Sequence, residues 1–156
     1  MSHPKIGNKA PDFTLAATGD QQIKLSGLRG APVVLYFYPK DATPGCTQEG
    51  LDFTAAIAEF NQLKVTILGL SRDSVASHEK FKLKQAFAFD LLSDSEEKAC
   101  HLYDIIKEKN MYGKKVMGIE RSTFLIDADG ALVQEWRKVK VKDHVQEVLE
   151  AVKQLA

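Results

Sequence analysis

Cys46 is the residue of this chain whose type and position point most directly to chemistry. It follows Thr43, Pro44 and Gly45, which is typical of a helix start, because threonine caps helices and proline is tolerated at the first helical position. Cys46 would then be the third helical residue, where backbone N–H groups lack partners and the helix dipole favours an anion. We therefore predict a cysteine held as a thiolate, the form in which sulfur acts as a nucleophile.

The helix predicted after Thr43 should bury the face that carries Cys46. Residues at spacings of three and four form one stripe of a helix, and here they are Cys46, Gly50, Phe53, Ile57 and Phe60. The sulfur should therefore point to the core side of the helix, at the floor of a pocket. Gly50 removes a side chain one turn below the sulfur, which indicates either close helix–sheet packing or room for the helix start to rearrange.

A thiolate alone is not enough for efficient catalysis, because the charge that moves from sulfur to a leaving group must be stabilised by fixed donors. The segment Pro39–Cys46, PKDATPGC, resembles the Pro-x-x-x-Thr/Ser-x-x-Cys signature of the peroxiredoxins. The longer stretch YFYPKDATPGCTQEG is similar to their bacterioferritin-comigratory-protein, or peroxiredoxin Q, subgroup. The resemblance continues through 69–74, 92–94 and 118–127 and covers nearly the whole chain.

This resemblance implies a thiol-dependent peroxidase that reduces hydrogen peroxide and organic hydroperoxides to water or alcohols, with neither a metal nor a cofactor. Cys46 would be the peroxidatic nucleophile and would become a sulfenic acid. Thr43 would orient the peroxide through its hydroxyl, Pro39 would shield the thiolate from water, and Arg121 would place a permanent charge beside the sulfur. Glu49, one turn from Cys46, would hold that guanidinium in place.

Residue type alone leaves simpler interpretations open. A free cysteine is most often a small buried hydrophobe, and Thr43 could be only a helix cap. Arg121 judged alone would be a surface charge, and Glu49 a solvated first-turn carboxylate that interacts with the helix dipole. An alternative function is a thioredoxin-like redox sensor or binding protein, in which Cys46 is oxidised stoichiometrically without turnover.

The chain departs from the subgroup in its second cysteine. The resemblance places a resolving cysteine either five residues after the peroxidatic one or in the following helix, at positions held here by Leu51 and Lys82. The remaining thiol, Cys100, is the only possible candidate, and we predict a structural role for it. We therefore expect a one-cysteine cycle in which an external thiol (thioredoxin, glutaredoxin or glutathione) reduces the sulfenic acid.

The order of elements around these residues predicts an α/β protein with a thioredoxin-like fold, a mixed central sheet flanked by helices and an N-terminal β-hairpin extension. Val33–Tyr38 is predicted as a strand buried on both faces, and one helix is expected from Thr43 to about Asn61. Before this strand we expect a hairpin of 12–15 and 23–25. After the helix we expect a strand over 65–71, a helix from 73–74, a strand near 91–92, a helix over 95–103, a polar loop, and a hairpin of 123–127 and 131–136. A last helix should begin at about Asp143 and carry Val145, Leu149, Val152 and Leu155 on one face.

Composition limits the class of protein and its partners. The chain has 156 residues, which fits one domain over 1–156, and 21 basic and 21 acidic residues, which favours neither nucleic acid nor an anionic membrane as a partner. We find no apolar run that fits a signal peptide or a bilayer span, and two cysteines do not make a disulfide framework. We expect a cytoplasmic protein that is a monomer or a weak homodimer.

Other kinds of site are less well supported. A thioredoxin-type dithiol reductase needs Cys-x-x-Cys, but Thr43 and Glu49 stand three residues either side of Cys46. A metal site is not expected, because metal-ligand spacing is absent among the histidines His3, His78, His101 and His144. A solvated basic face is predicted for Arg137, Lys138, Lys140 and Lys142.

Overall fold

The computed structural model describes residues 4–155, so His3 lies outside the described residues. Seven strands form one sheet in the order β2-β1-β5-β4-β3-β8-β9, and β6 and β7 form a separate two-stranded sheet. In chain order the elements are β1 (Thr14–Ala17), β2 (Gln21–Lys24), a 3-10 helix η1 (Leu25–Leu28), β3 (Val33–Phe37), α1 (Pro44–Ala55), α2 (Ile57–Gln62), β4 (Thr66–Ser71), α3 (Val75–Gln85), β5 (Asp90–Ser93), α4 (Lys98–Leu102), β6 (Ile106–Met111), β7 (Lys114–Ile119), β8 (Ser122–Ile126), β9 (Leu132–Trp136) and α5 (His144–Lys153).

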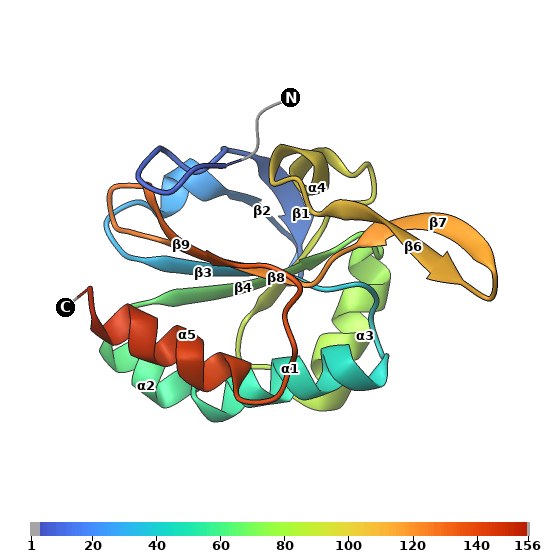
Figure 1. Cartoon of the computed structure of the whole chain (residues 1–156). Helices are drawn as coiled ribbons and strands as arrows, with labels where there is room; N and C mark the ends of the chain where they lie inside the picture. Colours follow the sequence, from blue (N-terminus) through green and yellow to red (C-terminus); the bar gives the residue numbers. More distant parts are fainter. Residues whose placement is uncertain (1–3, 156) are drawn as a thin grey trace.

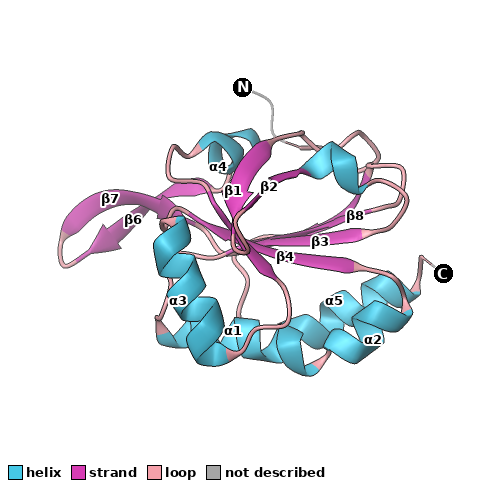
Figure 2. Cartoon of the chain, turned by 180° about the vertical axis from the view of Figure 1, so that it is seen from behind, coloured by secondary structure: helices cyan, strands magenta, loops and turns pink. Residues whose placement is uncertain are grey.

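The central sheet is mixed, as the sequence predicts. Strands β3, β4 and β5 run parallel, whereas β1 pairs with β5, and β8 with β3, in the antiparallel sense. Helices α1, α2, α3 and α5 cover one face, while η1 and α4 lie on the other side (Figures 1 and 2). The predicted α/β architecture with flanking helices and an N-terminal hairpin is confirmed. Within the described residues, none of the helices combines the length and apolar character needed to cross a bilayer.

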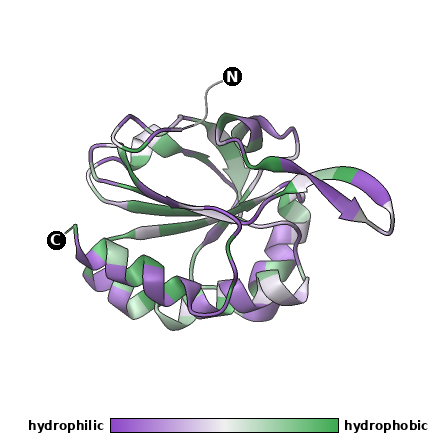
Figure 3. Cartoon of the chain, in the orientation of Figure 1, coloured by the Kyte–Doolittle hydropathy of each residue, from purple (hydrophilic) through white to green (hydrophobic). Residues whose placement is uncertain are grey.

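Strand β3 divides the interior into two apolar clusters. Every residue of β3 is buried, and successive side chains of a strand point to opposite faces of the sheet. Leu35 and Phe37 pack in one cluster with Cys100, whereas Tyr36 and Tyr38 pack in the other with Cys46. The two cysteines therefore lie on opposite faces of the central sheet, whose inner strands β3 and β4 are largely green, and so hydrophobic, in Figure 3.

The predicted polar loop between Tyr103 and Thr123 is wrong, because this segment forms the β6–β7 hairpin, which projects from the body (Figure 1). A two-residue turn joins the strands, with Met111 paired to Lys114. Both turn residues have positive φ, 54° at Tyr112 and 80° at Gly113, the backbone conformation of a type I′ hairpin turn.

Three further expectations are corrected in detail. The helix predicted from Thr43 to Asn61 is two helices, because Ala56 leaves helical geometry at φ −95° and ψ 4°. Leu155 does not belong to the buried face of α5, since it is 37% exposed and Val148 fills that face instead. Arg137 does not form a solvated face, because its guanidinium donates to the carbonyls of residues 103 and 104 and lies over the Phe124 ring.

Candidate functional site

The start of helix α1 places Cys46 as the sequence predicts. Thr43 occupies the N-cap with extended backbone angles, φ −85° and ψ 153°, and Pro44 begins the helix, so Cys46 is its third residue. The helix follows strand β3 and packs on the face of the sheet that carries Tyr36 and Tyr38. Cys46 is 2% exposed, and the sulfur therefore lies at the floor of the site rather than at its surface.

Arg121 lies directly beside this sulfur, although 75 residues separate the two in the chain. It stands between β7 and β8, and its Nη2 donates a hydrogen bond to Cys46 Sγ at 3.4 Å. Gly45 permits this approach, because a Cβ at that position would lie 3.1 Å from Nη2. The Arg121 side chain is only 15% exposed, so the guanidinium is mostly buried beside the sulfur.

Glu49 holds the other side of the same guanidinium. Its Oε1 accepts a hydrogen bond from Arg121 Nη1 at 2.6 Å, and its side chain is fully buried. Burial raises the pKa of Glu49 to about 7, even though the Arg121 charge and hydrogen bond act in the opposite direction. The Oε2 atom finds no hydrogen-bond partner within the described part of the chain. The interpretation of Glu49 as a solvated carboxylate is therefore wrong.

A carboxyl group whose pKa rises on folding makes stability depend on pH with a definite sign. The native state holds the Glu49 proton up to about pH 7, whereas the unfolded chain releases it near its ordinary value, so its contribution to stability is lost as pH rises. From about pH 6.5 to about pH 8, the free energy of unfolding should fall by about 1 kcal/mol more in the unaltered chain than in Glu49→Gln. Urea denaturation of both proteins at the two pH values measures this, and parallel curves would contradict it.

Thr43 and Pro39 belong to the loop that joins β3 to α1. The Thr43 side chain makes no cap hydrogen bond to the helix, and its hydroxyl instead donates to the carbonyl of Lys40 at 2.7 Å. This fixes the hydroxyl proton and leaves the oxygen as an acceptor. Pro39 is half-buried and lies two residues after the end of β3.

Close packing explains why residue 50 is a glycine, which is one of the two interpretations that the sequence leaves open. A Cβ at this position would lie 2.3 Å from Cζ of Phe87, closer than any real contact. The Phe87 ring stacks in turn on Phe89 at 5.5 Å. The glycine therefore lets the loop after α3 pack against α1 one turn below the sulfur.

Gly50→Ala should destabilise the fold, although alanine in a helix normally stabilises it by about 1 kcal/mol relative to glycine. The added methyl group must displace the Phe87 ring, and overpacking of this kind costs about 1–3 kcal/mol. Urea denaturation should show a lower free energy of unfolding for Gly50→Ala. The additional change Phe87→Leu should reduce the effect of the alanine, whereas a Gly50→Ala variant more stable than the unaltered chain would disprove the contact.

Cys100 lies on the other face of the sheet, in a setting that favours the thiol. It is fully buried, and its backbone N–H donates to Asp94 Oδ2 at 2.7 Å. Burial, together with the hydrogen bond and negative charge of Asp94, raises the pKa of Cys100 far above the ordinary value. A disulfide needs Cα atoms within about 7 Å, so Cys46 and Cys100 cannot pair without breaking the layers that separate them.

Lys109 is a charged neighbour of the site that the sequence interpretation missed, because it lies in the segment expected to be a loop. It is half-buried on β6, and its aliphatic stem packs against Gly118 of β7. Burial lowers its pKa, the charges of Arg121 and Arg72 add to that shift, and Cys46 opposes it. The Tyr112-Gly113 turn was the signal that could have revealed the hairpin and with it this lysine.

One cluster of side chains in the described chain has the spacing of a metal site. Ligand atoms of Asp41, Asp73 and His78 lie within 4.8 Å of one another. Asp41 and Asp73 already accept hydrogen bonds from protein donors, and both nitrogens of His78 face protein oxygens. The cluster is therefore explained without an ion.

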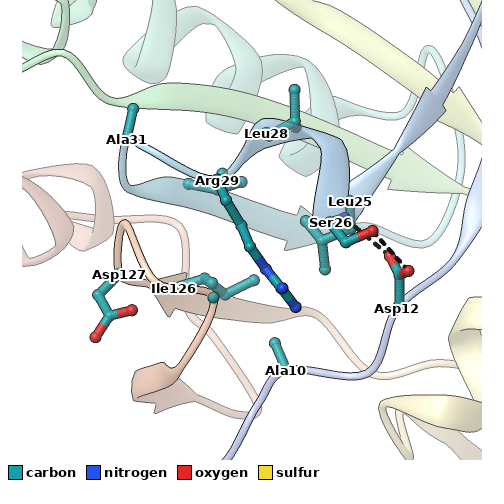
Figure 4. A pocket seen from close by; sticks show the side chains of 11 residues that line it. Ala10, Asp12, Leu25, Ser26, Leu28, Arg29, Ala31, Ile126 and Asp127 are labelled. Carbon is teal, nitrogen blue, oxygen red and sulfur yellow. Dashed lines mark hydrogen bonds between the residues drawn. The ribbon is translucent and has the colours of Figure 1, made fainter.

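A small cavity lies at the opposite end of β3 from Cys46 (Figure 4). Val33, the first residue of β3, lines it together with Ile126, the last residue of β8. Figure 4 shows the Arg29 side chain extending into it, near Ser26, which donates to the Asp12 carboxylate. This cavity is remote from the sulfur and plays no part in the arrangement around it.

Comparison with known proteins places this geometry in context. Residues 6–135 match the AhpC/TSA family. The chain is 56% identical over 142 residues to Peroxiredoxin Bcp of Xanthomonas campestris, covering 91% of this chain and 89% of the relative. It is 51% identical over 152 residues to Peroxiredoxin Bcp of Bacillus subtilis, covering 97% of each.

Solved structures give the same result for the fold. A structure of Xanthomonas campestris bacterioferritin comigratory protein, solved in connection with its alkyl peroxide reduction activity, superposes with a TM-score of 0.91 at 52% identity, over 97% of this chain and 99% of that one. A Xylella fastidiosa PrxQ structure superposes with a TM-score of 0.93 at 46% identity, over 99% of each chain.

Proposed function

Because the chain belongs to the AhpC/TSA family and is a thiol-dependent peroxidase, we propose that Cys46 is the thiolate that attacks the hydroperoxide and that it works without a second cysteine. The observation that carries this proposal is the hydrogen bond from Arg121 Nη2 to Cys46 Sγ at 3.4 Å. A guanidinium is always charged, and here it stands where negative charge moves from the sulfur to the leaving oxygen.

The first half-reaction follows from this arrangement. The Cys46 thiolate attacks one oxygen of ROOH, the S–O bond forms as the O–O bond breaks, and the products are Cys46 sulfenic acid and an alkoxide that takes a proton to leave as ROH. With hydrogen peroxide the leaving group becomes water. Arg121 stabilises the developing charge, while Glu49, hydrogen-bonded to its Nη1 at 2.6 Å, keeps the guanidinium in one orientation.

Thr43 and Pro39 act on the peroxide and on water. The Thr43 hydroxyl donates its hydrogen bond to the Lys40 carbonyl, so its oxygen is left to accept a hydrogen bond from the O–H of the hydroperoxide, which aims the O–O bond at the sulfur. Pro39, half-buried in the same loop, shields the thiolate from water.

The second half-reaction uses an external thiol. Cys46 sulfenic acid and R′SH give a mixed disulfide and water, and a second thiol then releases Cys46 and leaves R′SSR′. Leu51 and Lys82 occupy the positions where the subgroup carries a resolving cysteine, and Cys100 lies on the far face of the sheet. Thioredoxin, glutaredoxin and glutathione are the reductants to compare.

Mass spectrometry after one equivalent of peroxide tests both parts of the proposal. A sulfenic acid trapped on Cys46, followed by a mixed disulfide when glutathione is added, is the expected result. An intramolecular disulfide between Cys46 and Cys100 would replace the one-cysteine cycle with a two-cysteine cycle. A protein oxidised once, with no peroxide consumption in excess dithiothreitol, would indicate the redox sensor.

We further propose a single domain that acts in the cytoplasm as a monomer or a weak homodimer. Its two cysteines are unpaired, as expected in a reducing compartment. Sedimentation velocity at increasing protein concentration tests the oligomeric state.

A further inference from the structure

A buried polar cluster lies beneath the loop that carries Pro39 and Thr43. Its centre is the Asp41 carboxylate, which accepts from the Tyr38 hydroxyl on Oδ1 at 2.7 Å and from the Ser77 hydroxyl on Oδ2 at 2.8 Å. His78 Nδ1 lies 2.7 Å from the same Oδ2. Asp41 is 8% exposed and His78 is fully buried, so both groups are cut off from solvent.

The partners of His78 determine where its protons are. Nε2 lies 2.8 Å from the carbonyl oxygen of Leu92, which only accepts, so Nε2 must carry a hydrogen. Asp41 already accepts a hydroxyl hydrogen on each carboxylate oxygen, from Tyr38 on Oδ1 and from Ser77 on Oδ2. The carboxylate therefore also acts as an acceptor toward Nδ1, which lies 2.7 Å from Oδ2, so we place a hydrogen on Nδ1 as well.

The loop held by this cluster contains a strained residue. Ala42 has φ of +63°, a left-handed conformation that costs a non-glycine residue about 1–2 kcal/mol and persists only where its surroundings enforce it. Asp41, the preceding residue, is fixed by its carboxylate and also by its N–H, which donates to Asp73 Oδ2 at 2.8 Å. Thr43, the following residue, bonds back to the Lys40 carbonyl.

We propose that His78 is a positioning residue: as an imidazolium it pairs with Asp41 and holds the strained 39–43 loop in the shape that presents Thr43 to the peroxide at Cys46. The inference rests on the role proposed for Thr43. His78 acts through the loop, and its effect should appear in the reaction with peroxide rather than in the intrinsic nucleophilicity of the sulfur.

Histidine NMR on the unaltered protein tests the protonation state directly. With ¹⁵N-labelled histidine, both ring nitrogens of His78 should show the chemical shift and one-bond coupling of N–H groups at neutral pH. The titratable groups that face it are Tyr38 directly after β3, Asp41 of the loop and, behind Asp41, Asp73 before α3. His144 is the internal reference, because burial lowers its pKa to about 4, and it should carry one N–H. A neutral His78 would overturn the proposal.

The variant His78→Asn tests the function of the pair. Asparagine can still donate to Asp41 but carries no charge and does not reach Leu92. The rate of Cys46 oxidation by peroxide should fall by about 10-fold through misplacement of the loop, whereas alkylation by iodoacetamide should change less than about 2-fold. The matched control is His101→Asn, at an exposed histidine of α4, which should leave both rates unchanged.

Each other outcome has a defined meaning. An unchanged peroxide rate in His78→Asn, or equal falls in both rates, would overturn the positioning role. If Thr43→Val also reacts with peroxide at the normal rate, the proposed function of Thr43 fails; if Thr43→Val reacts slowly, only the role of His78 fails.

Loss of the peroxide rate on treatment with EDTA, restored by Zn²⁺, would replace the ion pair with a metal site. Should His78→Asn fail to fold, Tyr38→Phe removes one donor to Asp41 and should slow peroxide reduction by about 3-fold.

Discussion

Cys46→Ser should show no peroxide consumption above the uncatalysed background, a loss of at least about 10³-fold, with dithiothreitol as the reductant. A serine hydroxyl is not ionised at neutral pH and forms no sulfenic acid, so neither half-reaction is available to it. The serine hydroxyl can still accept the hydrogen bond that Arg121 Nη2 donates to Cys46 Sγ. A urea denaturation curve close to that of the unaltered chain should therefore accompany the loss.

The matched variant is Cys100→Ser, which should retain most of the activity. Cys100 packs with Leu35 and Phe37 on the face of the sheet opposite Cys46, and Asp94 and burial keep it as a thiol. Its replacement puts a hydroxyl in an apolar cluster, so it should lower the free energy of unfolding while leaving the peroxidase rate nearly unchanged. A comparable loss of turnover in the two variants would overturn the one-cysteine cycle.

The sequence predicts the part of the site that depends on local structure. Thr43 and Pro44 define the helix start, so the place of Cys46 as its third residue could be worked out from capping rules. The contact with Arg121 is different, because it joins residues 75 positions apart. Hydrophobic periodicity and residue propensities cannot predict a contact between residues so far apart in the chain. Only the resemblance to the peroxiredoxins suggested it.

The errors in the fold arise where tertiary packing overrides local signals. The segment 106–119 is rich in lysine and has little apolar alternation, so its hairpin depends on the turn at 112–113 and on pairing within a separate two-stranded sheet. In the sequence Arg137 resembles one of a run of surface charges, but two of its nitrogens donate to the carbonyls of residues 103 and 104, and a third donates to Glu135. The polar cluster around Asp41 and His78 was missed for the same reason, because its members come from three separate parts of the chain.

The site contains two features that oppose stability. Glu49 is a buried carboxyl with one oxygen lacking a partner in the described chain, and Ala42 has a left-handed backbone. Both stand within four residues of Cys46 in the sequence, and both bear on groups around the sulfur. Such strain persists where surrounding contacts enforce it, here the Arg121 pair on one side and the Asp41 cluster on the other.

Arg121→Ala should slow the oxidation of Cys46 by peroxide at least about 10-fold, since removing one fixed donor from a developing oxyanion costs about 10²–10³-fold in other enzymes. Stopped-flow measurement of a single turnover separates this step from reduction by the external thiol. The oxidation rate of Arg121→Lys should lie between those of Arg121→Ala and the unaltered chain. An ammonium keeps the charge, but it cannot bond to Glu49 and Cys46 from one rigid fork.

The control for Arg121→Ala is Arg72→Ala, which removes a guanidinium that pairs with Glu97 at 2.6 Å and should change the rate less than about 2-fold. Arg121→Ala also leaves Glu49 buried without a cation, which favours its protonated form and lowers stability. The slow rate should therefore be compared at a temperature where both variants are folded. A single-turnover rate in Arg121→Ala equal to that of the unaltered chain would remove this charge from the reaction, and the 3.4 Å contact would then be only structural.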